Sequence, residues 1–337
     1  MITNDILDKI KESNSVAITF HTSPDGDSLG SALGLLQGIR KLSKKAYIIS
    51  KEPIPETFKY LPCSEEITGE IKRPIEGTEC VIVLDCGNVE RINAELDLEN
   101  REYSLINIDH HLSNDMYGDL NFVDTNAPAV AEVVYQLLKI LEINSDKDIA
   151  ACLYTSLITD TGSFRYPGTT SVTHMIAGDL INTGLDFSSI HRKIFENKKF
   201  ERLKLYGKVL EEMYLENEKL CVMKVTEKML KELNIEDAKD TSDIISQGMQ
   251  IGSVEVAVLF KEVEEGVKIS LRSKEYVDVR KIAENFGGGG HIRASGAFIK
   301  GEALNIVEKK INRNYKKRVD INGWSNKCFK TKGDNIL

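Results

Sequence analysis

Three short apolar runs constrain the fold of this chain most strongly. They read VAITF at 16–20, CVIVLD at 80–85 and YSLINID at 103–109, and a fourth run, AYIIS, lies at 46–50. Unbroken apolar runs of this length, separated by helical patterns, are typical of parallel strands that are buried on both faces of a sheet. The first part of the chain is therefore predicted to be an α/β domain with a mainly parallel sheet covered by helices.

Helical periodicity surrounds these runs. Apolar spacing predicts helices at 5–13, 28–42, 129–141, 148–159 and 172–183. Ser28 is the expected N-cap of the second of these helices, and Gly184 can end the last one. The charged segment 186–213 has no turn signal before Gly207, so it is predicted to be a long helical linker.

The pattern changes after this linker. Strand-like runs at 220–226, 254–263 and 266–273 alternate with helical patterns at 277–286 and 302–314. Such a mixture over a short length indicates a smaller α+β domain. The predicted organisation is a first domain at 1–185, a helical linker at 186–213, a smaller second domain at 214–318 and a basic tail at 319–337.

Charge excludes some partners. The net charge of −8 argues against binding long duplex nucleic acid by neutralising its phosphates. Basic residues nevertheless outnumber acidic ones from Lys309 to Leu337, either as a solvated last helix and tail or as a basic rim that steers an anionic substrate. The sequence shows no apolar run of about 20 residues and no secretory signal, so we expect a cytoplasmic protein with no membrane partner.

Three of the predicted strands end in side chains that commonly ligate metals. The first leads into His21, Asp25 and Asp27, the next ends at Asp85, and the last ends in the triplet at 109–111. The carboxyl ends of parallel strands meet at one edge of a sheet, so these side chains are expected to converge. The alternative is that the aspartates form turns or cap backbone groups.

A further aspartate extends this set. Asp160 ends an otherwise apolar helix, where the helix dipole disfavours an acid unless a cation lies beside it. The six candidate ligands are His21, Asp25, Asp27, Asp85, His110 and Asp160. Such a set can hold two divalent ions about 3.5–4 Å apart, which together activate a water as hydroxide and neutralise charge on phosphorus. Mixed carboxylate and imidazole ligands favour Mn²⁺, with Co²⁺ and Mg²⁺ as alternatives.

A second cluster lies near the end of the chain. The segment FGGGGHIRASG at 286–296 has four consecutive glycines followed by His291 and Arg293. Glycines let backbone N–H groups approach an anion, and the two cationic side chains can bind phosphate. The pattern matches neither the dinucleotide-binding nor the P-loop motif, so it predicts a different anion clamp, with a flexible glycine loop as the alternative.

Taken together, the motifs resemble those of the DHH/DHHA1 phosphoesterases. HTSPDGDSLGS, VLDCG, IDHH, TDTGSFR and GGGGHIRASG occur in this order over nearly the whole chain. The set is similar to that of the nanoRNase/pAp phosphatase branch, the bifunctional oligoribonucleases and PAP phosphatases. Enzymes of this branch hydrolyse very short oligonucleotides and 3′-phosphoadenosine 5′-phosphate (pAp).

The resemblance implies a role for each residue. His21 and Asp25 would ligate one metal, Asp27, His110 and Asp160 would ligate the other, and Asp85 would bridge the two. His111 would lie by the scissile phosphate, and Asp109 would orient the histidines. Substrate contacts would come from Arg272, Gly288, Gly289, Gly290, His291 and Arg293. Arg91 and Arg165 are further candidates for substrate contact, whereas His174 and His191 are expected to be ordinary surface histidines.

The predicted activity is phosphoester hydrolysis. Short oligoribonucleotides of two to five nucleotides would be cleaved to mononucleotides, and pAp would be cleaved to AMP, in a cleft between the two domains. A cyclic-dinucleotide or linear pApA phosphodiesterase and a non-catalytic nucleotide sensor are the alternatives. The sequence is compatible with a homodimer through the first domain but leaves the oligomeric state and the direction of cleavage open.

Overall fold

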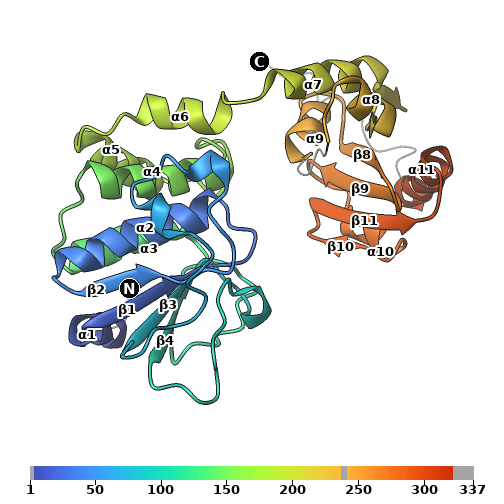
Figure 1. The fold of residues 1–337 in the computed structure, drawn as a ribbon. Helices are drawn as coiled ribbons and strands as arrows, with labels where there is room; N and C mark the ends of the chain where they lie inside the picture. Colours follow the sequence, from blue (N-terminus) through green and yellow to red (C-terminus); the bar gives the residue numbers. More distant parts are fainter. Residues whose placement is uncertain (1–3, 237–240, 322–337) are drawn as a thin grey trace, which may run out of the picture. The chain divides into compact units, whose positions relative to one another are not determined.

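The computed structural model describes residues 4–236 and 241–321. The chain forms two compact units, Met1–Asn197 and Lys198–Leu337 (Figure 1). The basic tail predicted at 319–337 lies outside the described residues beyond position 321. Within the described ranges, no helix is both long enough and apolar enough to cross a membrane.

The first unit contains a five-stranded parallel sheet. Its strands are β1 (Ser15–Thr19), β2 (Lys45–Ile48), β3 (Cys80–Leu84), β4 (Ser104–Asp109) and β5 (Leu120–Val123). They lie in the order β2-β1-β3-β4-β5, and every neighbouring pair is parallel. This confirms the predicted α/β fold. The short edge strand β5 was not predicted, because its residues are only half buried and show no long apolar run.

Helices of the first unit pack mainly on one face of this sheet. They are α1 (Asn4–Glu12), α2 (Gly26–Lys41), α3 (Val130–Ile140), α4 (Lys147–Asp160), α5 (Ser171–Asn182) and α6 (Phe187–Phe195), with short 3-10 turns at Glu56–Phe58, Ser64–Glu66 and Val89–Arg91. Ile18 of β1 shares the larger apolar core with Leu33 of α2 and Leu153 of α4. Ala17, which precedes Ile18 in β1, faces the other side of the sheet and packs there with Ile92 from the connection after β3.

Helices α2 and α4 lie in close contact along a row of glycines. A Cβ atom added to Gly30 would lie 2.4 Å from the carbonyl oxygen of Cys152. A Cβ atom on Gly26, the first residue of α2, would lie 2.5 Å from Thr159. The two helices therefore run antiparallel, and the start of α2 lies beside the end of α4.

The predicted linker helix at 186–213 is two helices. After α6, residues 196–199 are exposed and non-helical, and α7 (Phe200–Glu212) begins the next element. Ile190 of α6 is buried in the core of the first unit, whereas Leu205 of α7 is buried in a core of the second. The prediction of one continuous helix was wrong, because the apolar faces on either side of the break belong to different cores. The predicted limits of the domains stay a prediction.

A mixed six-stranded sheet organises the second unit. Its strands are β6 (Tyr214–Glu216), β7 (Leu220–Val225), β8 (Val256–Val263), β9 (Gly266–Ser273), β10 (Gly289–Gly290) and β11 (Ala294–Lys300), in the order β10-β11-β9-β8-β7-β6. Only the β7–β8 pair is parallel within this sheet. Its helices, besides α7, are α8 (Glu227–Glu232), α9 (Ser242–Met249), α10 (Arg280–Glu284) and α11 (Leu304–Ile321).

Each face of this second sheet has its own core. Ile269 of β9 packs with Ile282 of α10 and Val307 of α11 on one face. On the other face, Leu259 of β8 packs with Ile245 of α9. Strand β9 alternates buried and accessible residues along its length. The predicted α+β class of this smaller domain is therefore confirmed.

Candidate active site

The carboxyl ends of β1, β3 and β4 form the site. In the order β2-β1-β3-β4-β5, the connections leave β1 and β3 in opposite directions, which opens a crevice at their carboxyl ends. A cavity of about 360 Å³ lies there. It is lined by His21, Asp25, Asp85, Arg91, His110, His111, Leu112 and Asp160. The structure thus brings predicted metal ligands from four separate segments to one place.

One group of ligands gathers around His21. Its Nε2 lies 3.6 Å from Asp25 Oδ1 and 3.4 Å from Asp85 Oδ2. Its Nδ1 lies 2.8 Å from the carbonyl oxygen of Thr22, which orients the ring so that Nε2 faces the carboxylates. His21, Asp25 and Asp85 each offer one ligand atom, and these three atoms lie within 4.8 Å of one another, so the three side chains could share one metal ion.

A second group gathers around His110. Its Nε2 lies 3.7 Å from Asp27 Oδ2, 3.6 Å from Asp160 Oδ2 and 3.5 Å from Asp85 Oδ1. Its Nδ1 lies 2.9 Å from the carbonyl oxygen of Ala127, so this ring is also held by its other nitrogen. Asp85 reaches both groups, one through each oxygen.

Asp85 provides the test of whether the site fits two cations. Its side chain is 3% exposed, its backbone has a φ of 53°, and its Oδ1 accepts no hydrogen bond from any residue in the described ranges. Imidazole nitrogens lie 3.4–3.5 Å from its two oxygens, and a cation held with them would neutralise this buried carboxylate. The six oxygen- and nitrogen-bearing side chains could therefore hold hard divalent cations.

Asp25 also caps a helix. The predicted N-cap, Ser28, is instead the third residue of α2, and Asp25 occupies the cap position. Asp25 Oδ1 accepts hydrogen bonds from the backbone N–H groups of Asp27 and Ser28, each at 3.1 Å. The prediction for Ser28 was wrong because the loop turns directly into the helix at Gly26. The same Oδ1 lies 3.6 Å from His21 Nε2, so the cap bonds also hold this carboxylate beside the other candidate ligands.

The side-chain pKa values describe the same cluster. Burial opposes the charge on His21, but its hydrogen bonds to Asp25 and Asp85 raise its pKa to about 10. Burial likewise opposes the charge on His110, yet the carboxylates of Asp85 and Asp27 raise its pKa to about 10. Burial and neighbouring carboxylates raise the pKa of Asp160 to about 6. The metal-free cluster therefore holds protons that a divalent cation would displace.

Asp109 and His111 form a pair beside these ligands. Asp109 is fully buried, and its Oδ1 lies 2.7 Å from His111 Nδ1. This hydrogen bond raises the pKa of His111 above its usual value. Asp109 Oδ2 accepts a hydrogen bond of 2.5 Å from Asn114 Nδ2. Asn114 was not predicted as a site residue. The one signal in the sequence was its position five residues after Asp109.

Buried serines hold Asp27. Its Oδ1 accepts hydrogen bonds from Ser156 at 2.5 Å and from Ser31 at 3.1 Å, and its Oδ2 accepts one from the backbone N–H of Val130 at 2.9 Å. Asp27 is buried, and this burial raises its pKa well above the usual value. The two serines were also missed, although a hydroxyl on an apolar helix face is a signal that could have found them.

The rim of the cavity carries one cation and one exposed apolar side chain. Arg91 lines the cavity, and its Nη2 lies 3.3 Å from His21 Nδ1. Leu112 also lines it and is 90% exposed. Arg165, the other predicted arginine, donates from Nε to the carbonyl oxygen of Gly162 at 2.7 Å. Of the two predicted arginines, Arg91 lines the cavity and Arg165 does not.

The other two histidines have structural neighbours. The ring of His174 stacks on that of Phe164, with the centroids 5.0 Å apart. His191 Nε2 lies 3.0 Å from the hydroxyl of Ser163. Neither histidine lines the cavity.

The glycine-rich segment is a hairpin in the second unit. Gly289 and Gly290 form β10 and pair with Gly296 and Ser295 of β11. A Cβ atom on Gly288 would lie 2.1 Å from the carbonyl oxygen of Gly296, so the two strands approach closely only because glycine is present. His291 lies exposed at the turn between the strands. The segment therefore forms a hairpin, and its predicted role as an anion clamp stays a prediction.

Two arginines flank this hairpin. Arg272 of β9 is the cross-strand partner of Ala294, which lies next to the turn. Arg272 Nη1 donates a hydrogen bond of 3.0 Å to the carbonyl oxygen of Leu271. Arg293 donates from Nη1 to the carbonyl oxygen of Val277 at 2.9 Å and from Nη2 to that of Glu275. The Arg293 guanidinium thus holds the segment before α10, and its predicted contact with phosphate stays a prediction.

Comparison with known proteins places the chain in a family. Residues 15–157 match the N-terminal domain of the DHH family, and residues 217–317 match the DHHA1 domain. A bifunctional oligoribonuclease and PAP phosphatase NrnA of Thermus thermophilus is 30% identical over 88% of this chain and 87% of the relative. A probable bifunctional oligoribonuclease and PAP phosphatase NrnA of Streptococcus mutans is 33% identical over 87% of this chain and 92% of the relative.

A solved structure supports the fold. The crystal structure of an exopolyphosphatase-related protein from Bacteroides fragilis superposes with a TM-score of 0.85 at 24% identity, covering 95% of this chain and 98% of that protein. The family matches and the relatives agree with the resemblance that the motifs indicate. The chain therefore belongs to the DHH family of phosphoesterases, carries a DHHA1 domain and is a hydrolase of phosphoester bonds.

Proposed function

We propose that this hydrolase cleaves oligoribonucleotides of two to five nucleotides to mononucleotides and cleaves pAp to AMP, with two divalent cations in the first unit. The observation that carries the proposal is Asp85, a buried carboxylate that lies between two groups of His and Asp side chains and whose Oδ1 accepts no hydrogen bond within the described ranges. The names of the relatives, which pair oligoribonuclease with PAP phosphatase activity, support the choice of substrates.

The ligand set indicates which residues would hold the cations. His21 and Asp25 would hold one, Asp27, His110 and Asp160 would hold the other, and Asp85 would contact both. Bound divalent cations would lower the pKa of a water molecule and neutralise negative charge on the attacked phosphate. The mixture of carboxylate and imidazole ligands favours Mn²⁺ over Mg²⁺ or Co²⁺.

His111 is proposed as the acid of the reaction. Its Nδ1 is held by Asp109, which leaves Nε2 available to donate a proton to the leaving oxygen. The raised pKa of His111 keeps more of this side chain protonated near neutral pH. Asp109 is buried and itself anchored by Asn114, so the ring is oriented before substrate binds.

The glycine hairpin is proposed as the clamp for the rest of the substrate. The side chains of His291 and Arg272 and the backbone N–H groups at Gly289 and Gly290 would offer donors for a terminal phosphate or nucleotide, whereas the Gly288 N–H donates to the carbonyl oxygen of Ala283. Arg293 supports this hairpin through its bonds to the Glu275 and Val277 carbonyls. Whether Arg293 also contacts phosphate is a separate part of the proposal.

An activity panel tests the proposal. Purified protein with Mn²⁺ would be assayed on pAp, on RNA from dinucleotide to 24-mer, and on cyclic and linear dinucleotides of adenine. We expect mononucleotide release from the shortest RNAs and AMP from pAp, with little activity on the 24-mer. Failure on both pAp and dinucleotide RNA would refute the proposal.

The same panel separates the alternatives. Turnover confined to cyclic dinucleotides or linear pApA would assign the other phosphodiesterase activity. Tight binding of pAp in Mn²⁺ without turnover would assign a nucleotide sensor. A cytoplasmic location and a homodimer stay predictions from the sequence.

A further inference from the structure

One face of β9 and β11 carries a row of side chains that starts at Arg272 of the proposed clamp and continues to residues that the clamp does not use. In the register of these antiparallel strands, Arg272 lies across from Ala294, Ser270 from Gly296, and Lys268 from Phe298. The intervening residues of β9 point to the opposite face, where Ile269 and Leu271 are buried in a core. We call the row formed by Arg272, Ser270, Lys268, Ala294, Gly296 and Phe298 the strip.

The strip begins at the glycine hairpin. Gly296, in its middle, pairs with Gly289 of the hairpin on its other side. The central residues of the strip are small, so the backbone there can be approached closely. Arg272 lies four residue positions after Lys268, which corresponds to about 13 Å along the strand. At a stacked rise of about 3.4 Å per nucleotide, this length can accompany up to about four nucleotides.

The far end of the strip combines an aromatic ring with a cation. Phe298 is 43% exposed, so its ring is accessible to a ligand. The Lys268 side chain is exposed and forms no ion pair or hydrogen bond with a residue in the described ranges. An aromatic face that stacks a base and a lysine that binds the backbone are the two parts of a site for single-stranded nucleic acid.

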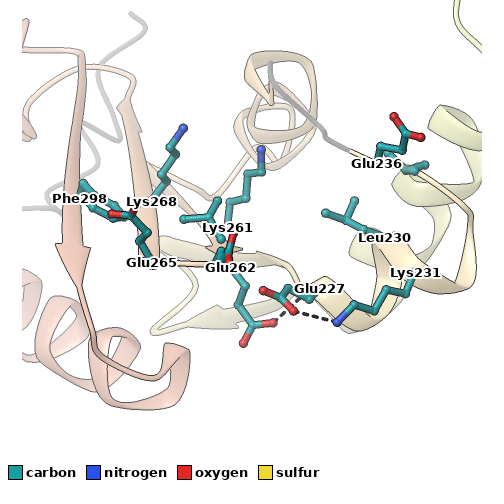
Figure 2. A pocket seen from close by; sticks show the side chains of 12 residues that line it. Glu227, Leu230, Lys231, Glu236, Lys261, Glu262, Glu265, Lys268 and Phe298 are labelled. Carbon is teal, nitrogen blue, oxygen red and sulfur yellow. Dashed lines mark hydrogen bonds and ion pairs between the residues drawn. The ribbon is translucent and has the colours of Figure 1, made fainter.

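A cavity adjoins this end of the strip. It has a volume of about 740 Å³ and is lined by Lys268 and Phe298 together with Leu230 and Lys261. Figure 2 shows Phe298 and Lys268 at one side of this cavity and Leu230 at the other. Its size lies within the range of small-molecule sites in proteins, so a nucleoside can be accommodated.

Carboxylates limit the site beyond this point. The cavity is also lined by Glu227, Glu236, Glu262, Glu264 and Glu265. Lys231 and Lys300 neutralise two of them, through ion pairs of 3.0 Å with Glu227 and 3.2 Å with Glu265. The remaining acidic groups would repel further phosphates of a longer strand. Attraction along the strip followed by repulsion at its end favours a ligand of limited length.

We propose that the Lys268–Phe298 end of the strip is a distal subsite, which binds the nucleotides beyond the first two of a short single-stranded oligonucleotide. The acidic rim then sets an upper limit on substrate length. The inference rests on the proposed function, because it assigns a further subsite to the same substrate. Dinucleotides and pAp are too short to use it.

The test compares substrates of two lengths in the full-length protein. The KM for a pentanucleotide would be divided by the KM for a dinucleotide in the unaltered protein, in Lys268→Glu, in Phe298→Ala and in Phe298→Tyr. Since base stacking on an aromatic side chain contributes about 1–3 kcal/mol, the ratio is expected to rise about ten-fold or more in Phe298→Ala. Lys268→Glu should raise it similarly, and Phe298→Tyr should not, because the tyrosine ring still stacks.

A matched control is available at the other edge of the sheet. Lys219→Ala removes an exposed lysine from the turn between β6 and β7, which lie at the opposite end of the strand order from the glycine hairpin. This variant should leave the ratio unchanged. A ratio that stays constant in Lys268→Glu and Phe298→Ala, or a KM that rises equally for both substrates, would overturn the inference.

Binding distinguishes this failure from a failure of the proposed function. If the unaltered protein hydrolyses neither substrate, fluorescence anisotropy in EDTA would measure its affinity for labelled RNAs of two and five nucleotides. Tighter binding of the longer RNA that is lost in Lys268→Glu would support the subsite without the activity. Equal affinity for both lengths would overturn the inference.

Discussion

Replacing Asp109 with asparagine separates the role of this residue from that of a metal ligand. Asp109 is fully buried and accepts a hydrogen bond from His111 Nδ1, while its other oxygen is held by Asn114. Asparagine keeps the shape of the side chain but removes its negative charge. The protonated form of His111 then loses its ionic partner, so the pKa of His111 should fall.

The size of this fall follows from the hydrogen bond. A hydrogen bond to a charged group contributes about 1.5–3 kcal/mol, or about one to two pKa units at 1.36 kcal/mol per unit. The His111 side chain is 41% exposed, and water compensates part of the loss at this exposure. We therefore expect a decrease near the lower limit, of about one unit.

The assay is the pH dependence of kcat with Mn²⁺ and a dinucleotide substrate. If protonated His111 donates to the leaving group, activity falls as pH rises through the pKa of His111. In Asp109→Asn this alkaline limb should move to lower pH, and kcat at neutral pH should fall toward the level of His111→Ala. General acid catalysis contributes about 10²–10⁴-fold, which bounds the loss in that second variant.

Two measurements complete the test. Asp119→Asn removes a half-exposed carboxylate that pairs with Arg101 in the same unit, and it should leave the profile unchanged. The metal content of Asp109→Asn, measured by mass spectrometry, should equal that of the unaltered protein. An alkaline limb that does not move would refute the role of Asp109 in holding a protonated His111. Loss of metal would show that Asp109 is itself a ligand.

Three further outcomes are expected. Asp85→Asn should abolish turnover and remove most of the rise in Tm that Mn²⁺ causes, which corresponds to about 2.7 kcal/mol at a hundred times Kd; an undiminished rise would contradict its bridging position. In EDTA, protonated His21 stabilises the folded chain at neutral pH because its pKa is raised to about 10. This contribution to stability should be lost as pH rises through that value. The free energy of unfolding, measured with denaturant, should therefore decrease less with rising pH in His21→Gln than in the unaltered protein. His291→Ala should raise KM about ten-fold with little change in kcat, since a charge-assisted hydrogen bond contributes about 1.5–3 kcal/mol; a fall in kcat alone would argue against the clamp.

The strands and the ligands at their ends could be predicted from the sequence because a local pattern marks each of them. An unbroken apolar run predicts a buried parallel strand, and an acid or histidine at its end has few structural explanations. His21 and Asp85 converge simply because β1 and β3 are neighbours in the sheet. No contact over a long distance had to be guessed once the sheet was predicted to be parallel.

Other features depend on contacts that the sequence does not show. Arg293 looks like a phosphate ligand beside four glycines, yet its guanidinium binds backbone carbonyls from the segment before α10. The helical pattern at 186–213 gave no sign that its two halves pack into different cores. Asn114 and Ser156 act through hydrogen bonds to buried aspartates. The hydroxyl of Ser156 on an apolar helix face indicated a buried partner without identifying it, and Asn114, alone in a loop, carries no such signal.

The glycine row between α2 and α4 determines how rigid the metal ligands are. Asp27 lies at the start of α2 and Asp160 at the end of α4, so their separation depends on how closely the two helix axes approach. With Gly30 against the Cys152 carbonyl, any side chain there would force the helices apart and widen the gap between the two carboxylates. The spacing of the ligands is thereby built into a helix–helix contact rather than left to mobile loops. An enzyme built this way needs little rearrangement at the moment of reaction, but it has little freedom to adapt to cations of a different radius.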